Sequence, residues 1–157
     1  MDTEKSIILL QAMQKHELTI AKLYLAYAER FEAEAEFWNE LSEAEVRHSR
    51  CLQKVKDLMA DNPEIQIAQR FTLEAINSSI RYINELIDRA ASPEFQPINA
   101  LSLAMKLEEA FLEKNYFEVL TGDSEEIKDT LELLRSETEQ HFQILKEKVD
   151  SFKLHGR

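Results

Sequence analysis

Five glutamate and histidine side chains occupy positions where the helical pattern of the chain calls for apolar residues. Apolar residues recur at alternating spacings of three and four, which is typical of helices that bury one face. The pattern is interrupted at Glu17, Glu45, His48, Glu109 and His141. A buried carboxylate without a partner costs several kcal/mol, so a stable protein must give these groups one.

The types and spacing of these residues favour a metal ion as that partner. Glu45 and His48 are three residues apart, so they project from one helix face. A glutamate from a neighbouring helix would complete a site of carboxylate oxygen and imidazole nitrogen. The second half of the chain has Thr138 where the corresponding glutamate would stand, and Glu137, about 100° around the helix, is the candidate substitute.

The predicted metal ligands are therefore Glu17, Glu45, His48, Glu109, His141 and Glu137. We expect no catalytic residue distinct from these ligands and no organic cofactor. His16 points about 100° away from Glu17 on the same helix and is expected to be exposed.

Helix-breaking residues divide the chain and predict which elements position these ligands. Breaks fall at Asp61-Asn62-Pro63, at Ser92 to Pro97 and at Gly122-Asp123-Ser124. We expect one all-α domain, 1–157, with core helices at about 3–31, 35–60, 97–121 and 124–153, and a crossover helix at about 66–91. The third core helix should bury Ser102, Met105, Glu109 and Leu112.

The turn between the first two helices has no glycine or proline signal. One helix from Thr3 to Ala60 would be about 85 Å long, which suits an extended coiled-coil adaptor and not a compact domain. We therefore place a turn near Ala33. Glu17 then lies about 16 residues before that turn and Glu45 about 12 after it, at nearly the same height in the bundle.

The two halves of the chain resemble each other. The stretch from Met13 to Tyr24 aligns without a gap with that from Met105 to Tyr116, which pairs Glu17 with Glu109. The pattern predicts a duplicated helical hairpin with a set of ligands in each copy.

Composition narrows the function classes further. The chain has 157 residues with 2 glycines and 3 prolines, so it favours long helices over a β-sandwich. A net charge of −11 disfavours binding to nucleic acid. The single cysteine, Cys51, excludes a disulfide framework and a four-cysteine metal site. No signal peptide or membrane span is recognisable, and we expect a cytoplasmic protein without a membrane partner.

The chain resembles the rubrerythrin-like branch of the ferritin-like superfamily, without its rubredoxin domain. The matching stretches are Glu17-x6-Tyr24, Glu36-Phe37-Trp38 followed by Glu45-Val46-Arg47-His48, Leu107-Glu108-Glu109-x6-Tyr116, and the region ending at His141. The resemblance implies a ferritin-like four-helix bundle of two antiparallel hairpins. It also implies one or two iron ions, or other divalent metals, that reduce peroxide or oxidise ferrous iron with oxygen.

Two further expectations concern partners, and one alternative concerns the function. An external electron donor is expected, because one cysteine cannot form a rubredoxin site. A homodimer is expected, for which the isoleucine-rich face of the crossover helix is a candidate surface. The alternative is a bundle that has kept the fold but lost the metal, and that acts as a scaffold or interaction protein.

Overall fold

The computed structural model describes residues 3–67, 72–113, 120–121 and 124–155. The predicted all-α class is confirmed. The helices are α1 (Thr3–Arg30), α2 (Ala35–Asp61), α3 (Leu73–Arg89), α4 (Pro97–Glu113) and α5 (Glu125–His155). Two short strands, β1 (Gln66–Ile67) and β2 (Leu120–Thr121), pair antiparallel, with Gln66 opposite Thr121 and Ile67 opposite Leu120.

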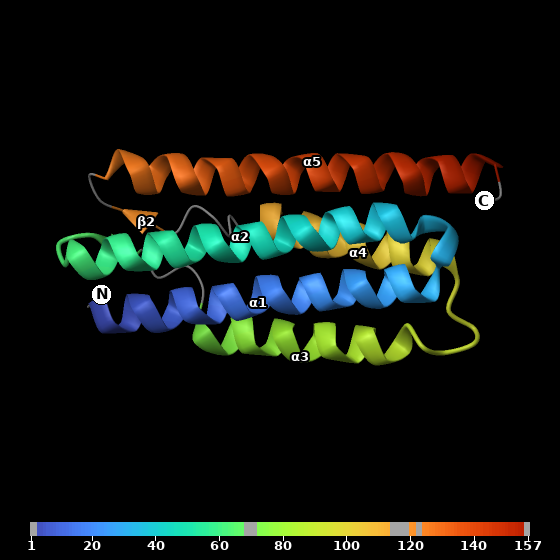
Figure 1. The fold of residues 1–157 in the computed structure, drawn as a ribbon, viewed down its shortest axis with the longest axis horizontal. Coiled ribbons are helices and arrows are strands. Elements are labelled where there is room, and N and C mark those ends of the chain that lie inside the picture. Colours follow the sequence, from blue (N-terminus) through green and yellow to red (C-terminus); the bar gives the residue numbers. More distant parts are fainter. Residues whose placement is uncertain (1–2, 68–71, 114–119, 122–123, 156–157) are drawn as a thin grey trace.

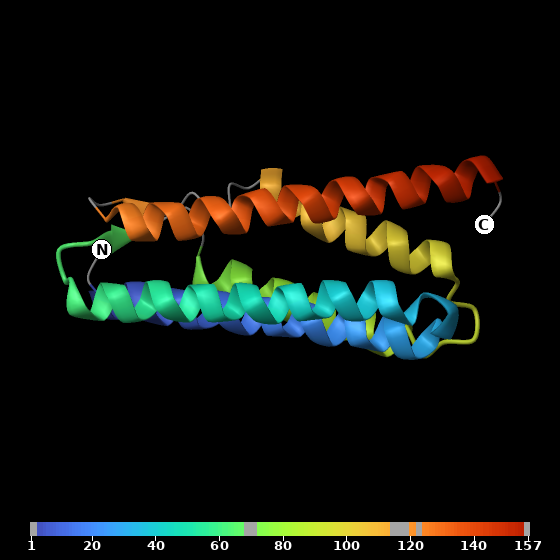
Figure 2. The same ribbon diagram turned by 45° about the horizontal axis from the view of Figure 1, so that its top comes forward.

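The helices lie side by side in two layers. α1, α2 and α3 form one layer, and the hairpin of α4 and α5 forms the other (Figures 1 and 2). α5 runs antiparallel to α2, and contacts at both ends hold the two together: Lys54 pairs with Glu126 at 3.0 Å, and Lys148 lies 4.5 Å from the centre of the Phe37 ring. The two hairpins thus enclose a common interior.

The chain turns between α1 and α2 in one short 3-10 segment, Glu32–Glu34, so the predicted turn near Ala33 is present and a single continuous helix is absent. Phe31 leaves the helical conformation with φ −122° and ψ 78°. Tertiary contacts replace the missing glycine or proline signal. The Arg30 guanidinium donates a hydrogen bond to the Phe95 carbonyl oxygen at 3.2 Å, and the Phe31 and Phe95 rings stack with centroids 6.0 Å apart.

The crossover helix is shorter than the predicted 66–91. Within the described residues, α3 begins at Leu73, because the Thr72 hydroxyl caps it by accepting a hydrogen bond from the Ala75 amide at 3.0 Å. Gln66 and Ile67 belong to β1 instead. The buried side chains of α3 are Ile76, Ile80, Ile83 and Leu86. This face packs along α1 (Figure 1).

α4 is described from Pro97 to Glu113, and the predicted continuation over 114–119 lies outside the described residues. Leu120 and Thr121, at the predicted end of the helix, belong to β2 instead. The buried face of α4 also differs from the prediction. Ser102, Met105, Glu109 and Leu112 are only half-buried, whereas the fully buried residues are Ala100, Leu101, Ala104, Leu107, Glu108 and Phe111. The small side chains of Ala100 and Ala104 let this face approach its neighbours closely. The helix is therefore rotated by about one residue, or 100°, from the predicted orientation.

An aromatic cluster fills the interior at the α1–α2 turn. Trp38 is fully buried, and its ring centroid lies 4.9 Å from that of Tyr27 and 5.6 Å from that of Tyr24. Phe95 stacks on Tyr27 at 5.6 Å, so the segment between α3 and α4 is tied to α1 and α2.

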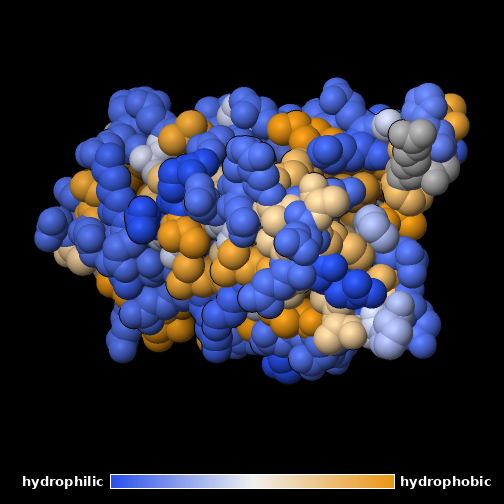
Figure 3. Space-filling view, turned by 45° about the vertical axis from the view of Figure 1, so that its right-hand side comes forward, coloured by the Kyte–Doolittle hydropathy of each residue, from blue (hydrophilic) through white to orange (hydrophobic). Residues whose placement is uncertain are grey.

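The face shown in Figure 3 is largely hydrophilic at its edges, and apolar side chains gather toward its middle. Among the described residues, no helix combines the length and apolar character needed to cross a membrane.

Replacement of Trp38 with alanine should test the importance of the aromatic cluster. Trp38→Ala leaves a large cavity beside Tyr24 and Tyr27, so the free energy of unfolding should fall by about 3–5 kcal/mol. Leu133→Ala is the control, because Leu133 is 50% exposed and should change stability by no more than about 0.5 kcal/mol. Urea unfolding followed by circular dichroism measures both. Equal effects of the two substitutions would contradict the assignment of this cluster as core.

Candidate metal centre

The first group of potential ligands joins α1 to α2. The His48 Nδ1 atom lies 3.2 Å from Glu45 Oε2 and 3.9 Å from Glu17 Oε2. All three side chains are at most 2% exposed. Each contributes one ligand atom within 4.8 Å of the others, so the group could hold a metal ion.

The second group joins α2 to α4 and α5. The His141 Nδ1 atom lies 3.5 Å from Glu45 Oε1 and 3.8 Å from Glu108 Oε1. These three residues are also buried, and one ligand atom of each lies within 4.8 Å of the other two. Glu45 belongs to both groups, with one carboxylate oxygen facing each histidine. The two imidazole rings stack with centroids 5.7 Å apart, so the groups form one continuous centre.

The register of α1 against α2 brings Glu17 to the height of Glu45. The Ser42 hydroxyl donates a hydrogen bond to the Ala21 carbonyl oxygen at 2.9 Å on one side of the centre. On the other side, the Gln14 amide donates to the Gln53 side-chain oxygen at 2.9 Å. These cross-links fix the sliding position of the two helices.

The structure does not bring the predicted ligand Glu109 into either group and places Glu108 there instead. Glu109 is half-buried, whereas Glu108 is 1% exposed and its Oε1 accepts a hydrogen bond from the Tyr24 hydroxyl at 2.8 Å. The gapless repeat pairs Glu17 with Glu109, one residue away from the glutamate that faces inward. The spacing of Leu101, Ala104, Glu108 and Phe111 contains the signal for the true face, once alanine is counted as a core residue.

Glu137 reaches the centre from α5 but belongs to neither group of ligand atoms. Its Oε1 lies 3.5 Å from His48 Nε2, on the opposite side of the ring from Glu17 and Glu45. A carboxylate in that position orients an imidazole whose other nitrogen faces a metal. Thr138 is buried between Leu134 and His141, and its hydroxyl donates to the Leu134 carbonyl oxygen at 2.9 Å.

His16 is buried, contrary to the expectation of an exposed side chain. It is 1% exposed, and its Nε2 atom is 2.7 Å from the Ser79 hydroxyl on α3. The sequence pattern of α1 alone could not reveal this, because α3 covers a second face of α1.

The carboxylates of the centre carry opposite pKa shifts. Burial, reinforced by repulsion from Glu45, raises the pKa of Glu17 to about 8. Burial and the charge of Glu108 also act to raise the pKa of Glu45. Favourable interactions with Glu17, His141 and His48 outweigh them, and the pKa of Glu45 is lowered. Glu17 therefore keeps its proton at neutral pH while Glu45 is ionised.

Both histidines are protonated when no metal is bound. Burial alone would lower the pKa of His48, but the neighbouring carboxyl groups of Glu17 and Glu45 raise it to about 11. Burial likewise opposes protonation of His141, yet its interactions with Glu108 and Glu45 raise its pKa to about 10. In the metal-free state, protons compensate the negative charge that metal ions would otherwise balance.

The residues present fit a metal ion. Four buried atoms that face or flank the centre have no hydrogen-bond partner among the described residues: Glu17 Oε1, Glu45 Oε1, His48 Nε2 and His141 Nδ1. Buried polar atoms rarely remain unsatisfied in this way, and the mixture of carboxylate and imidazole suits iron, manganese or zinc.

Comparisons with known proteins identify no related protein. Searches against protein-family models, curated proteins and solved structures each found no significant match. The chemistry of the centre is therefore the guide to the function of this protein.

The raised pKa of Glu17 predicts a pH-dependent stability for the metal-free protein. Glu17 releases its proton at about pH 8 when folded but near its ordinary pKa of 4.5 when unfolded. Its contribution to stability is therefore complete below pH 4.5 and is lost as the pH rises through 8. Glu17→Gln removes this titration, so the variant should match the wild type near pH 4.5 and exceed it by about 4–5 kcal/mol at pH 9.

Urea unfolding at both pH values in the presence of a chelator measures this difference. Glu29→Gln, an exposed substitution on the same helix, should track the wild type throughout. A constant difference between Glu17→Gln and the wild type across this pH range would contradict the raised pKa.

Proposed function

We propose that this chain is a ferritin-like metal-binding protein whose centre, related to that of rubrerythrins, holds two adjacent iron ions. The position of Glu45 carries the proposal. Its two carboxylate oxygens face two different histidines, each of which has a further glutamate beside it. A single buried ion pair would need only one of these contacts. A carboxylate that serves two neighbouring cations would need both.

Each ion would have its own ligands on either side of the bridging Glu45. Glu17 and His48 would hold one ion, and Glu108 and His141 would hold the other. Bound iron would supply the redox chemistry needed to reduce peroxide or to oxidise ferrous iron. Tyr24 fixes the Glu108 carboxylate through its hydroxyl, and Glu137 fixes the His48 ring. Electrons for peroxide reduction would come from another protein.

The second candidate function is a metal-free scaffold. The specific observation in its favour is that the two protonated histidines already pair with Glu45 and Glu108, so the buried charges are compensated without an ion. Metal binding must displace those protons, which makes the measured metal content the decisive quantity.

Removal of the shared carboxylate should abolish binding of both ions. Anaerobic titration of the metal-free protein with ferrous iron, followed by elemental analysis, should give about two ions per chain for the wild type and less than about 0.2 for Glu45→Ala. His141→Ala should retain the ion held by Glu17, Glu45 and His48. Glu43→Ala, an exposed change on the same helix, is the control and should bind as the wild type does.

The outcomes separate the two functions. Loss of iron in Glu45→Ala, together with peroxide consumption by the loaded wild type, would support the redox centre. No iron binding to a folded wild-type chain would support the scaffold function instead. Undiminished binding to folded Glu45→Ala would exclude this centre as the metal site.

Thr138 offers a gain-of-function test of the second ion. It is buried on the same face of α5 as His141, and Thr138→Glu would add a carboxylate beside the second group. Affinity for the second ion should rise by at least about tenfold, because an added anionic ligand strengthens cation binding. Thr130→Glu, another buried threonine of α5 outside both groups, is the matched control. Isothermal titration with ferrous iron measures both, and equal affinities would contradict the proposed second ion.

A further inference from the structure

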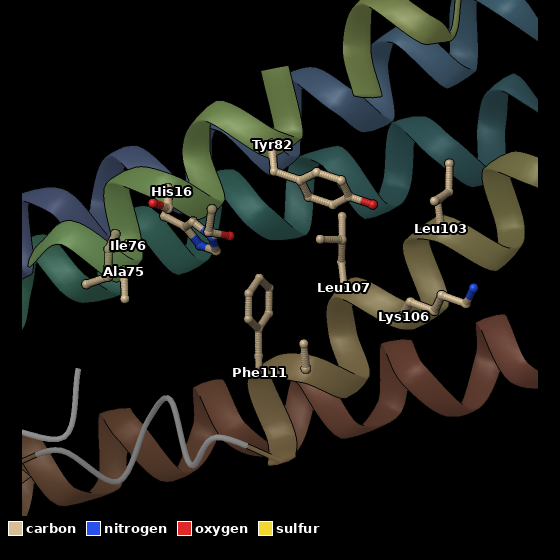
Figure 4. A pocket seen from close by; sticks show the side chains of 11 residues that line it. His16, Ala75, Ile76, Tyr82, Leu103, Lys106, Leu107 and Phe111 are labelled. Atoms are coloured by element: carbon tan, nitrogen blue, oxygen red, sulfur yellow. The ribbon is translucent and has the colours of Figure 1, made fainter. Parts of the chain in front are cut away.

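A cavity of about 490 Å³ lies between α1, α3 and α4 (Figure 4). None of the metal ligands proposed above lines it. Tyr82 from α3 and Phe111 from α4 stand on opposite sides of the space, and Leu107 lies between them. Its volume falls within the range of about 300–1,000 Å³ that is typical of pockets for small organic ligands.

The walls of the cavity are apolar, and their two ends carry different polar groups. At one end, His16 is held by the Ser79 hydroxyl at 2.7 Å and by edge-on contact with the Phe111 ring, whose centroid is 4.9 Å away. At the other end lie Leu103 and Lys106 (Figure 4). Lys106 places an ammonium group at this second end.

Lys106 is the only lysine, arginine, aspartate or glutamate among the described lining residues, and its side chain is exposed. It forms no ion pair with a carboxylate in the part of the chain that the structure describes, although the protein carries a net charge of −11. A lone ammonium at the edge of an apolar cavity complements a ligand with one negative charge.

We propose that this cavity binds a small aromatic monocarboxylate. The ring of the ligand would lie between the Tyr82 and Phe111 rings and against Leu107, where aromatic surfaces stack favourably. Its carboxylate would pair with the Lys106 ammonium. A single cationic side chain beside largely apolar walls does not suit a phosphorylated ligand, which carries more than one negative charge.

The cavity and the metal centre use different residues of the same helices. His16 and Leu107 line the cavity, whereas their chain neighbours Glu17 and Glu108 belong to the centre. Ligand binding can therefore be measured on the metal-free protein, and its failure would leave the metal proposal untouched.

The test uses the fluorescent probe 2-naphthoate and its neutral analogue 2-naphthamide, titrated into the full metal-free chain in the presence of a chelator. The wild type should bind 2-naphthoate about tenfold or more tightly than 2-naphthamide, because only the former carries the charge. Lys106→Gln should weaken 2-naphthoate binding to the level of the amide. Lys22→Gln, an exposed change on α1 outside the cavity, should leave it unchanged.

A second variant tests the location of the bound ring. Ala110 lines the cavity from α4, and Ala110→Phe would fill it, so this variant should lose both probes while keeping the helical circular dichroism of the wild type. Absence of 2-naphthoate binding to the wild type would overturn the proposal. Equal binding of the two probes, or unchanged binding in Lys106→Gln, would overturn it as well.

Discussion

The buried carboxylate of Glu45 is the group on which the two layers of the molecule depend. It is 2% exposed, and its two oxygens face histidines that come from different hairpins, His48 from α2 itself and His141 from α5. An anion cannot be buried at this depth unless cations or protons balance it. α5 must therefore lie where His141 can reach Glu45, and α4 must present Glu108 to the same ring. The hydrogen bond from Tyr24 to Glu108 then joins α4 to α1.

The same constraint links the stability of the protein to its chemistry. In the metal-free state, the protons on Glu17, His48 and His141 balance the carboxylates. Two divalent ions would need those positions deprotonated, so protons and metal compete for one set of atoms. A centre made of apolar side chains would fold at least as well. Retention of five ionisable groups in the interior is thus a cost to the fold that metal binding would offset.

The sequence predicted the burial of a side chain correctly where the pattern of its own helix determines that burial. It did not predict burial that depends on a second helix packed against the first. Glu17, Glu45, His48 and His141 interrupt apolar patterns within single helices, and the structure brings all four together. Glu109 was predicted in place of Glu108 because the pattern counted large apolar side chains and passed over Ala100 and Ala104, which are both buried. The burial of His16 requires α3, and the contact of Glu137 with His48 requires the rotation of α5 against α2.

Helical geometry explains how two sites can share α1 and α4 without sharing a side chain. Consecutive residues on a helix point about 100° apart, so His16 and Leu107 face α3 and the cavity while Glu17 and Glu108 face α2 and α5. The backbone of α4 is nevertheless common to both faces, since Leu107 and Glu108 are consecutive residues of one turn. Occupation of the cavity beside Leu107 would therefore act on the turn that positions Glu108, whose Oε1 atom lies 3.8 Å from His141 Nδ1.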